Sequence, residues 1–308
     1  MGGRIAKERK LTWYTGCQSY LRNPMAMRDR FIHITDLHFW EVVTNPLRLL
    51  NKRALGNINI YLKRRHHFPM ERALTYIDYI NALDIKDVII TGDFASTSTQ
   101  FEFEEGVRFV QALEEGGKSI TVISGNHDVY TFEAKRNKDF EKHFSQWLPD
   151  APLPCTRQLP GGTPIVYVPT VCANFLSSKG RVSDSEIETT VTLVKSLDSP
   201  IIVAGHYPIL NKTKAYDASP GRQLRNGEKL RTALGNTGKD ILYICGHVHR
   251  FSDETDPQYP NIRHLTSGAL FRTAPETNSD GDFSVIEINE SEIRIIQHLH
   301  QGGEWMTA

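Results

Sequence analysis

The chain has 308 residues, of which 39% are hydrophobic and 23% are charged, as is typical of a soluble globular protein with one large or two modest domains. Lysine plus arginine and aspartate plus glutamate each total 36, so the net charge is zero and no specific nucleic-acid partner is indicated. The four cysteines lack CxxC spacing, which favours reduced thiols in a cytoplasmic protein.

The first 30 residues precede the first strand-like run and lack the apolar core of a signal peptide. We therefore expect a disordered N-terminal arm over 1–30, or a start misassigned upstream of Met25 or Met27. The rest of the chain, 31–308, is expected to form a single domain. It contains no run that approaches the ~20 apolar residues needed to cross a bilayer.

Short apolar runs predict strands along this domain, and helical patterns separate several of them. The strands are expected at 31–35, 87–91, 119–124, 164–168, 200–205 and 240–246. Helices are expected at 70–83, 102–117 and 183–198, the last with Ser183 as N-cap and Glu186 three residues later. Apolar strands that alternate with helices predict an α/β protein with both sheet faces covered.

The C-terminal part changes character, because its strand-like runs have no helix between them. They lie at 261–268, 282–289 and 292–299, and the last two predict a C-terminal β-hairpin. Long irregular stretches are expected elsewhere, at 125–136, 149–163, 207–221 and 251–260 among others. Irregular stretches of this length are often functional.

Five strands end in side chains that can bind metal ions. In chain order they are Asp36 and His38, then Asp93, then Asn126, His127 and Asp128, then His206, and finally His247 and His249. Each motif alone is more easily explained as a turn or a cap. Five unrelated turns, however, would not share the carboxyl edge of a sheet, where ligands of α/β proteins bind. The sequence therefore predicts a metal site at this edge.

These side chains divide into two sets of nitrogen and oxygen donors. One set is Asp36, His38, Asp93 and His249, and the other is Asp93, Asn126, His206 and His247. Asp93 can then bridge two ions roughly 3.5–4 Å apart, as in two-metal phosphoester hydrolysis. No cysteine joins either set, which disfavours structural zinc. Imidazole mixed with carboxylate and carboxamide suits manganese or iron, or zinc, at an open site.

The motif order DLH, GD, GNHD, GHYP and GHVH, between residues 31 and about 268, resembles the calcineurin-like metallophosphoesterases. The size and compact spacing are most similar to the branch of bacterial cyclic-nucleotide phosphodiesterases and lipid diphosphate hydrolases. The resemblance implies a four-layer α/β/β/α sandwich with mixed sheets and a dinuclear centre. It implies one metal at Asp36, His38 and His249, and the second at Asn126, His206 and His247. It also implies that His127 protonates the leaving oxygen while Asp128 orients its ring.

The resemblance implies a metal-dependent phosphohydrolase, in the first place a phosphodiesterase. Hydroxide or water held by the two ions is expected to attack phosphorus in line. A non-catalytic scaffold of the same fold is the alternative from another functional class. A scaffold would be expected to have lost ligands, whereas every ligand position is filled here.

Residues 45–69 form a basic, amphipathic insertion that has two readings. It is either a solvated helix packed over the sheet edge or a lid that receives an anionic lipid headgroup through Arg64 and Arg65. The lid makes hydrolysis of a lipid-linked diphosphate of the UDP-diacylglucosamine type, at the inner face of the membrane, the alternative function.

A second basic cluster is a candidate for contacting substrate phosphate, although exposed lysines are usually only solvated. It consists of Lys212, Lys214, Arg222 and Arg225.

Overall fold

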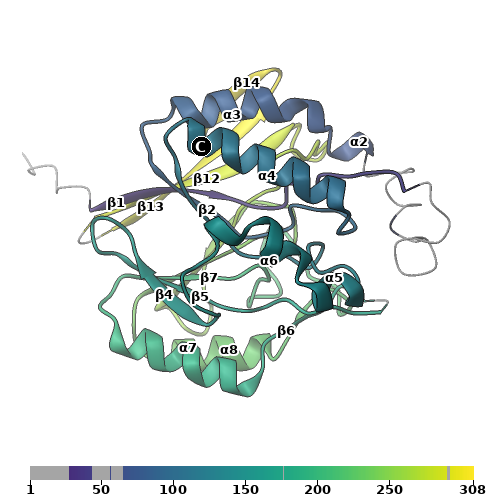
Figure 1. Cartoon of the computed structure of the whole chain (residues 1–308). Helices are drawn as coiled ribbons and strands as arrows, with labels where there is room; N and C mark the ends of the chain where they lie inside the picture. Colours follow the sequence, from purple (N-terminus) through teal and green to yellow (C-terminus); the bar gives the residue numbers. More distant parts are fainter. Residues whose placement is uncertain (1–27, 44–55, 57–64, 176, 290–291) are drawn as a thin grey trace, which may run out of the picture.

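The computed structural model describes residues 28–43, 56, 65–175, 177–289 and 292–308 (Figure 1). The expected arm, apart from residues 28–30, and most of the 45–69 insertion lie outside the described residues. Within the described part, no helix is both long and apolar enough to cross a membrane. The described cysteines are free thiols: Cys155, Cys172 and Cys245.

Two six-stranded mixed sheets form the centre of the molecule. The first has the order β14 (Glu304–Thr307), β13 (Ile293–Gln301), β12 (Gly281–Ile288), β1 (Asp29–Ile34), β2 (Asp87–Ile90), β3 (Ser119–Val122). The second has the order β10 (Ser252–Thr255), β11 (Ile262–Thr266), β9 (Ile241–Cys245), β7 (Ile201–Ala204), β5 (Pro164–Tyr167), β4 (Cys155–Gln158). β1, β2 and β3 run parallel, as do β5, β7, β9 and β11, so within each sheet the carboxyl ends of these strands share one edge.

Helices cover the outer face of each sheet (Figure 1). α3 (Ala73–Ala82) and α4 (Gln100–Glu115) lie over the first sheet, and α7 (Asp184–Ser196) and α8 (Gly227–Gly235) lie over the second. The shorter described elements are α2 (Arg65–His67), η3 (Met70–Arg72), α5 (Phe132–Asn137), α6 (Asp139–His143), η4 (Ser145–Trp147) and the paired β6 (Gly180–Arg181) and β8 (Leu224–Arg225). The expected capping box of α7 is confirmed, because Ser183 Oγ accepts from the Glu186 amide and Glu186 accepts from the Ser183 amide.

Three apolar layers follow from the alternation of side chains along the strands. Along β1, Ile32 and Ile34 pack towards α3 and α4, whereas Phe31 packs between the two sheets against residues such as Ile286. A third layer, which includes Val203 and Leu230, joins the second sheet to α7 and α8. The expected four-layer α/β/β/α sandwich is therefore confirmed.

The predicted strands and helices are confirmed to within three residues at each end, with the largest difference at the start of α3, and the C-terminal hairpin of β12 and β13 is confirmed. Several elements were not expected: α5, most of which lies in the stretch 125–136, α6, α8, β14, and the strands β4 and β10. β4 and β10 are the outermost strands of the second sheet, with the polar sequences CTRQ and SDET. An outermost strand packs against fewer neighbours and needs no apolar run, so 149–163 and 251–260 were wrongly taken as wholly irregular.

Candidate metal centre

The five polar motifs meet where β1, β2, β3, β7 and β9 end, and backbone hydrogen bonds hold the first two side by side. The amide of Asp36 donates to the Gly92 carbonyl at 3.0 Å, and the amide of His38 donates to the Asp93 carbonyl at 2.9 Å. These bonds continue the pairing of β1 with β2 beyond the ends of both strands. The DLH and GD motifs are thereby fixed opposite each other.

The first ligand group consists of Asp36, His38, Asp93 and His249, whose donor atoms all lie within 4.8 Å of one another. Nε2 of His249 lies 3.2 Å from Asp36 Oδ1 and 2.8 Å from His38 Nε2. His38 Nε2 also lies 3.6 Å from Asp93 Oδ2. The structure therefore brings together every residue predicted for the first metal.

The second ligand group consists of Asp93, His206 and His247, again with donor atoms within 4.8 Å of one another, together with Asn126. The amide oxygen Oδ1 of Asn126 lies 3.1 Å from His206 Nε2 and 2.8 Å from His247 Nδ1. His206 Nε2 lies 3.4 Å from Asp93 Oδ2, the same oxygen that faces His38. A single carboxylate oxygen thus lies between the two groups, as the predicted bridging role requires.

The spacing of these atoms fits coordination of divalent ions. Ligands at about 2.1 Å from a common ion are separated by about 3.0 Å in octahedral and about 3.4 Å in tetrahedral geometry. The distances above span 2.8–3.6 Å. Moreover, Asp36 Oδ1 and Asp93 Oδ2 are buried, and neither has a hydrogen-bond donor among the described residues. Two buried carboxylate oxygens without donors are expected where cations bind.

The rings of His38, His206 and His247 are each held by the nitrogen that faces away from the centre. His38 Nδ1 contacts the Ala95 carbonyl at 3.3 Å, and His206 Nδ1 contacts the Thr91 carbonyl at 2.8 Å. His247 is reversed, since its Nε2 contacts the Arg222 carbonyl at 2.9 Å and its Nδ1 faces Asn126. Donation to a carbonyl fixes the tautomer and presents the other nitrogen as a metal ligand. Sequence reasoning missed these partners, because every residue type has a carbonyl.

The backbone of the centre is strained. Nine described residues other than glycine have a positive φ, and five of them are candidate ligands, with φ from 54° to 71°. These five are Asp36, His38, Asp93, His247 and His249. Left-handed backbone is uncommon outside glycine and costs about 1–3 kcal/mol where the surroundings impose it. Gly246 completes this packing, since a Cβ there would overlap with Thr35 and Asp36. Such strain accumulates at functional sites.

The two carboxylates of the centre stay ionised. Burial by itself would raise the pKa of Asp36, but His249 and His38 hold it well below its ordinary value. Burial is likewise outweighed at Asp93, where His206 and His127 lower the pKa. The pKa of His206 is raised to about 9 because Asp93 outweighs the effect of burial, whereas burial together with His206 lowers the pKa of His247 to about 3. The centre therefore attracts cations.

The contacts of Asp128 differ from the expected ones. Its carboxylate accepts hydrogen bonds from the amides of Asp93, Ala95 and Gly125 at 2.7–2.9 Å, so it orders the loops that carry the ligands. Nδ1 of His127 instead lies 2.6 Å from the Ser96 carbonyl. The His127 ring lies 4.9 Å from the His38 ring, beside the first ligand group. Ser96 thus orients the ring in the way that Asp128 was expected to.

The structure shows no side-chain contact between the candidate metal centre and the described basic residues that were predicted to contact substrate. Arg64 lies outside the described residues, and only the backbone of Arg65 is described, in α2. Arg222 contacts the centre through its carbonyl, while its residue is exposed to solvent. Arg225 donates to Asn174 Oδ1. At the end of the 45–69 insertion, the buried Phe68 ring packs 4.8 Å from the His38 ring.

Comparisons with known proteins agree with this geometry. A sequence model described as calcineurin-like phosphoesterase (Metallophos) matches residues 29–251. The fold is similar to that of a dimetal phosphatase from Danio rerio, with a TM-score of 0.53 and 14% identity over 92% of this chain and 99% of that chain.

A purple acid phosphatase from yellow lupin seeds has a TM-score of 0.54 and 14% identity over 90% of this chain, which spans only 52% of the lupin protein. A search of curated protein sequences found no match. The family match covers most of the chain and all five motifs. The chain belongs to the calcineurin-like phosphoesterase family.

Proposed function

We propose that this protein is a metal-dependent phosphohydrolase that cleaves phosphodiesters at a dinuclear centre. The observation that carries the proposal is the position of Asp93 Oδ2, 3.6 Å from His38 Nε2 and 3.4 Å from His206 Nε2, between two complete ligand groups. The full ligand set speaks against the non-catalytic scaffold, and the compact spacing of the motifs supports a diester as substrate.

The residues divide the work between holding cations and moving a proton. Asp36, His38 and His249 would hold one ion, and Asn126, His206 and His247 the other, with Asp93 between them. Manganese or iron suits this mixture of donors best, and zinc is the alternative. When bound, such ions withdraw charge from the phosphoryl oxygens and activate water as the nucleophile.

His127 is the proposed proton donor to the leaving oxygen. The Ser96 carbonyl, 2.6 Å from Nδ1, requires a proton on that nitrogen, so Nε2 is the atom that transfers a proton to the departing alkoxide. The ring also stacks on Tyr130, with 5.4 Å between ring centroids and 13° between the planes. The carbonyl and the tyrosine together fix the direction in which the ring presents Nε2.

The test is metal content combined with turnover. Purified protein is stripped with a chelator, reloaded with Mn²⁺, Fe²⁺ or Zn²⁺, and assayed with bis(p-nitrophenyl) phosphate and p-nitrophenyl phosphate. The proposal requires about two ions per chain, turnover that chelation abolishes and metal restores, and a preference for the diester. A protein that binds no metal and hydrolyses neither ester would contradict it, whereas a preference for the monoester would contradict only the diester assignment.

Hydrolysis of a lipid-linked diphosphate is a second candidate, because Phe68 brings the end of the basic 45–69 insertion against the His38 ring. A cytoplasmic enzyme would then work at the inner face of the membrane, with Arg64 and Arg65 on anionic headgroups. Wild-type protein should sediment with phosphatidylserine liposomes, and Arg64→Gln/Arg65→Gln should not. The matched control is Arg136→Gln, a basic change in α5 outside the insertion. Wild-type protein that ignores these liposomes would exclude this candidate.

A further inference from the structure

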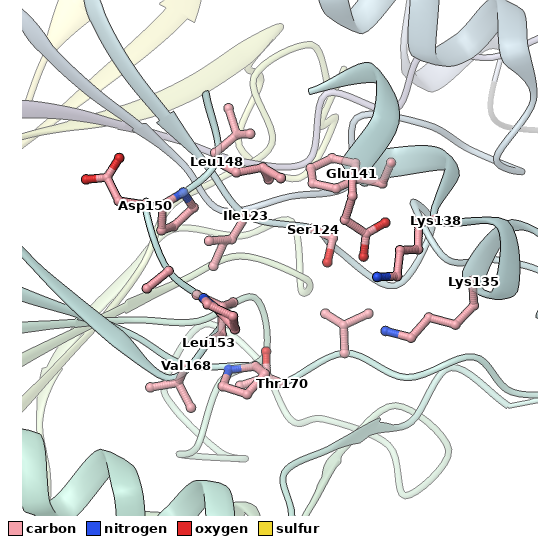
Figure 2. Close-up of a pocket in the computed structure, with 17 residues that line it drawn as sticks. Ile123, Ser124, Lys135, Lys138, Glu141, Leu148, Asp150, Leu153, Val168 and Thr170 are labelled. Carbon is pink, nitrogen blue, oxygen red and sulfur yellow. The ribbon is translucent and has the colours of Figure 1, made fainter. Parts of the chain in front are cut away.

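A cavity of about 480 Å³ lies in the space between the ends of β3 and β5, next to the start of the loop that carries Asn126 (Figure 2). These strands belong to different sheets, so the cavity lies between the two sheets of the sandwich. Its walls include Ile123, Leu148, Leu153 and Val168. The volume and the mostly apolar lining are those of sites for small organic molecules.

Two lining residues join the cavity to the second ligand group. Ser124 directly precedes Gly125 and Asn126 in the chain, so the wall of the cavity continues into the loop that carries a ligand. Thr170 lines the cavity, and its Oγ1 accepts a hydrogen bond from the backbone amide of His206 at 3.0 Å. The walls of the cavity therefore adjoin the two chain segments that carry Asn126 and His206.

Charge is distributed unevenly along the cavity. Figure 2 shows Lys135 and Lys138 at the end that also holds Ser124, with Leu148 and Asp150 towards the opposite end. Within the described part of the chain, neither lysine forms an ion pair with a carboxylate. Glu141 lies beside them, so two ammonium groups and one carboxylate leave one net positive charge at this end. An apolar cavity that is cationic at the end holding Ser124, two residues before Asn126, fits an anion with an apolar tail.

We propose that this cavity binds the apolar alcohol group of the substrate, with Lys135 and Lys138 attracting its phosphoryl oxyanion towards the metal centre. The inference rests on the proposed function and narrows its substrate class to phosphoesters of an alkyl or aryl alcohol of medium size. A single net positive charge matches the single negative charge of a diester. Each methylene buried in the cavity should increase affinity by roughly fourfold.

The test compares octylphosphonate with methylphosphonate, two probes that share a headgroup and cannot be hydrolysed at their carbon–phosphorus bond. Calorimetric titration of the full chain, with and without Mn²⁺, gives both dissociation constants. If four or more methylenes are buried, octylphosphonate should bind at least about 100-fold more tightly. Because both headgroups meet the same cations, the ratio reports on the cavity alone. Equal affinities would overturn the proposal.

Two variants locate the effect. Ala151 is exposed and lines the cavity, so Ala151→Trp should fold and occlude it, reducing the affinity ratio to below about tenfold. Lys135→Gln/Lys138→Gln should weaken both probes about equally, because it changes only the charge near the shared headgroup. The matched control is Lys142→Gln, an exposed lysine of α6 that does not line the cavity, and it should change neither constant.

The outcomes separate this inference from the proposed function. An unchanged ratio in Ala151→Trp would overturn the inference even if Mn²⁺-loaded protein hydrolyses diesters. Conversely, a high ratio that Ala151→Trp abolishes would support the cavity site in a protein that hydrolyses no ester, and the proposed function alone would then fail.

Discussion

The described part of the chain buries aspartate beside histidine at the metal centre and in a second cluster, and the two clusters satisfy their polar atoms differently. In the structural cluster, formed by Arg231 of α8, Asp256 and His264 of β11, both Asp256 oxygens are fully used. They accept from the Arg231 guanidinium at 2.6 and 2.7 Å, contact His264 Nε2 at 2.7 Å, and accept from two backbone amides. At the metal centre, by contrast, Asp36 and Asp93 each keep one buried oxygen without a donor among the described residues.

The backbone draws the same distinction. None of the three residues in the structural cluster has a positive φ, whereas five candidate ligands of the metal centre do. A buried carboxylate that is matched by donors on relaxed backbone stabilises the fold. A buried carboxylate that keeps one oxygen without a donor, on strained backbone, is placed to bind a group that the chain itself does not supply. The contrast separates structural from functional aspartates, and four changes test it.

The largest expected effect is that of Asp93→Asn. An amide cannot supply the negative charge between the two ligand groups, and bound ions contribute several kcal/mol of charge stabilisation, so turnover should fall by at least about 1,000-fold. Metal content per chain should fall with it, as measured by mass spectrometry of the elements. Asp198→Asn, at an exposed position, is the control. Full activity in Asp93→Asn would remove the bridging role.

Asp256→Ala should affect stability rather than chemistry. It leaves the buried Arg231 guanidinium without its main partner, which typically costs about 3 kcal/mol in the free energy of unfolding. Urea unfolding measures the loss, with Asp198→Ala as control. Turnover per folded molecule should stay at the wild-type level. If Asp256→Ala lost activity while its unfolding free energy was unchanged, the division into structural and functional clusters would be wrong.

His127→Gln separates proton transfer from metal binding. The metal content should stay the same, because His127 belongs to neither ligand group. Turnover should fall by about 100-fold, the lower range for loss of a general acid. A substrate with a good leaving group, such as a p-nitrophenyl ester, should be affected less than an alkyl ester. Equal losses on both esters would show that His127 does not protonate the leaving oxygen.

The smallest effect is a pH dependence at Asp282, a buried carboxylate that accepts from Gln297 Nε2 at 2.6 Å. Unlike Asp36 and Asp93, it has no histidine to oppose burial, which raises its pKa to about 7. The folded state therefore keeps a proton that the unfolded chain has lost, so stability falls as the pH rises from about 4 to 7.

Asp282→Asn removes this dependence. It should be more stable than the wild type at pH 8, by about 1–2 kcal/mol, and nearly equal to it at pH 4. Urea unfolding of metal-free protein at both pH values measures the difference. The same difference at both pH values would show that Asp282 does not titrate in this range.

Much of the fold follows from local patterns. The buried strands β1, β2, β7 and β9 are apolar because both of their faces are covered, so they appear in the sequence as short apolar runs. β4 and β10 lie at the edges and carry polar residues, and nothing local distinguishes them from loops. β4 and β10 become strands because they pair with β5 and β11. That pairing depends on residues outside the two segments themselves, so it cannot be read from their own sequences.

The candidate metal ligands could be selected from the sequence alone, since aspartate, asparagine and histidine at five strand ends have a shared chemistry and a shared edge. The tertiary structure alone decided how they are held. The Ala95, Thr91 and Arg222 carbonyls, the Ser96 carbonyl on His127, and the task of Asp128 all depend on which backbone groups come within 3.3 Å. The residue type identifies a side chain's chemistry, whereas nearly every residue has the same backbone amide and carbonyl. Only the folded structure therefore determines which backbone groups orient the candidate ligands.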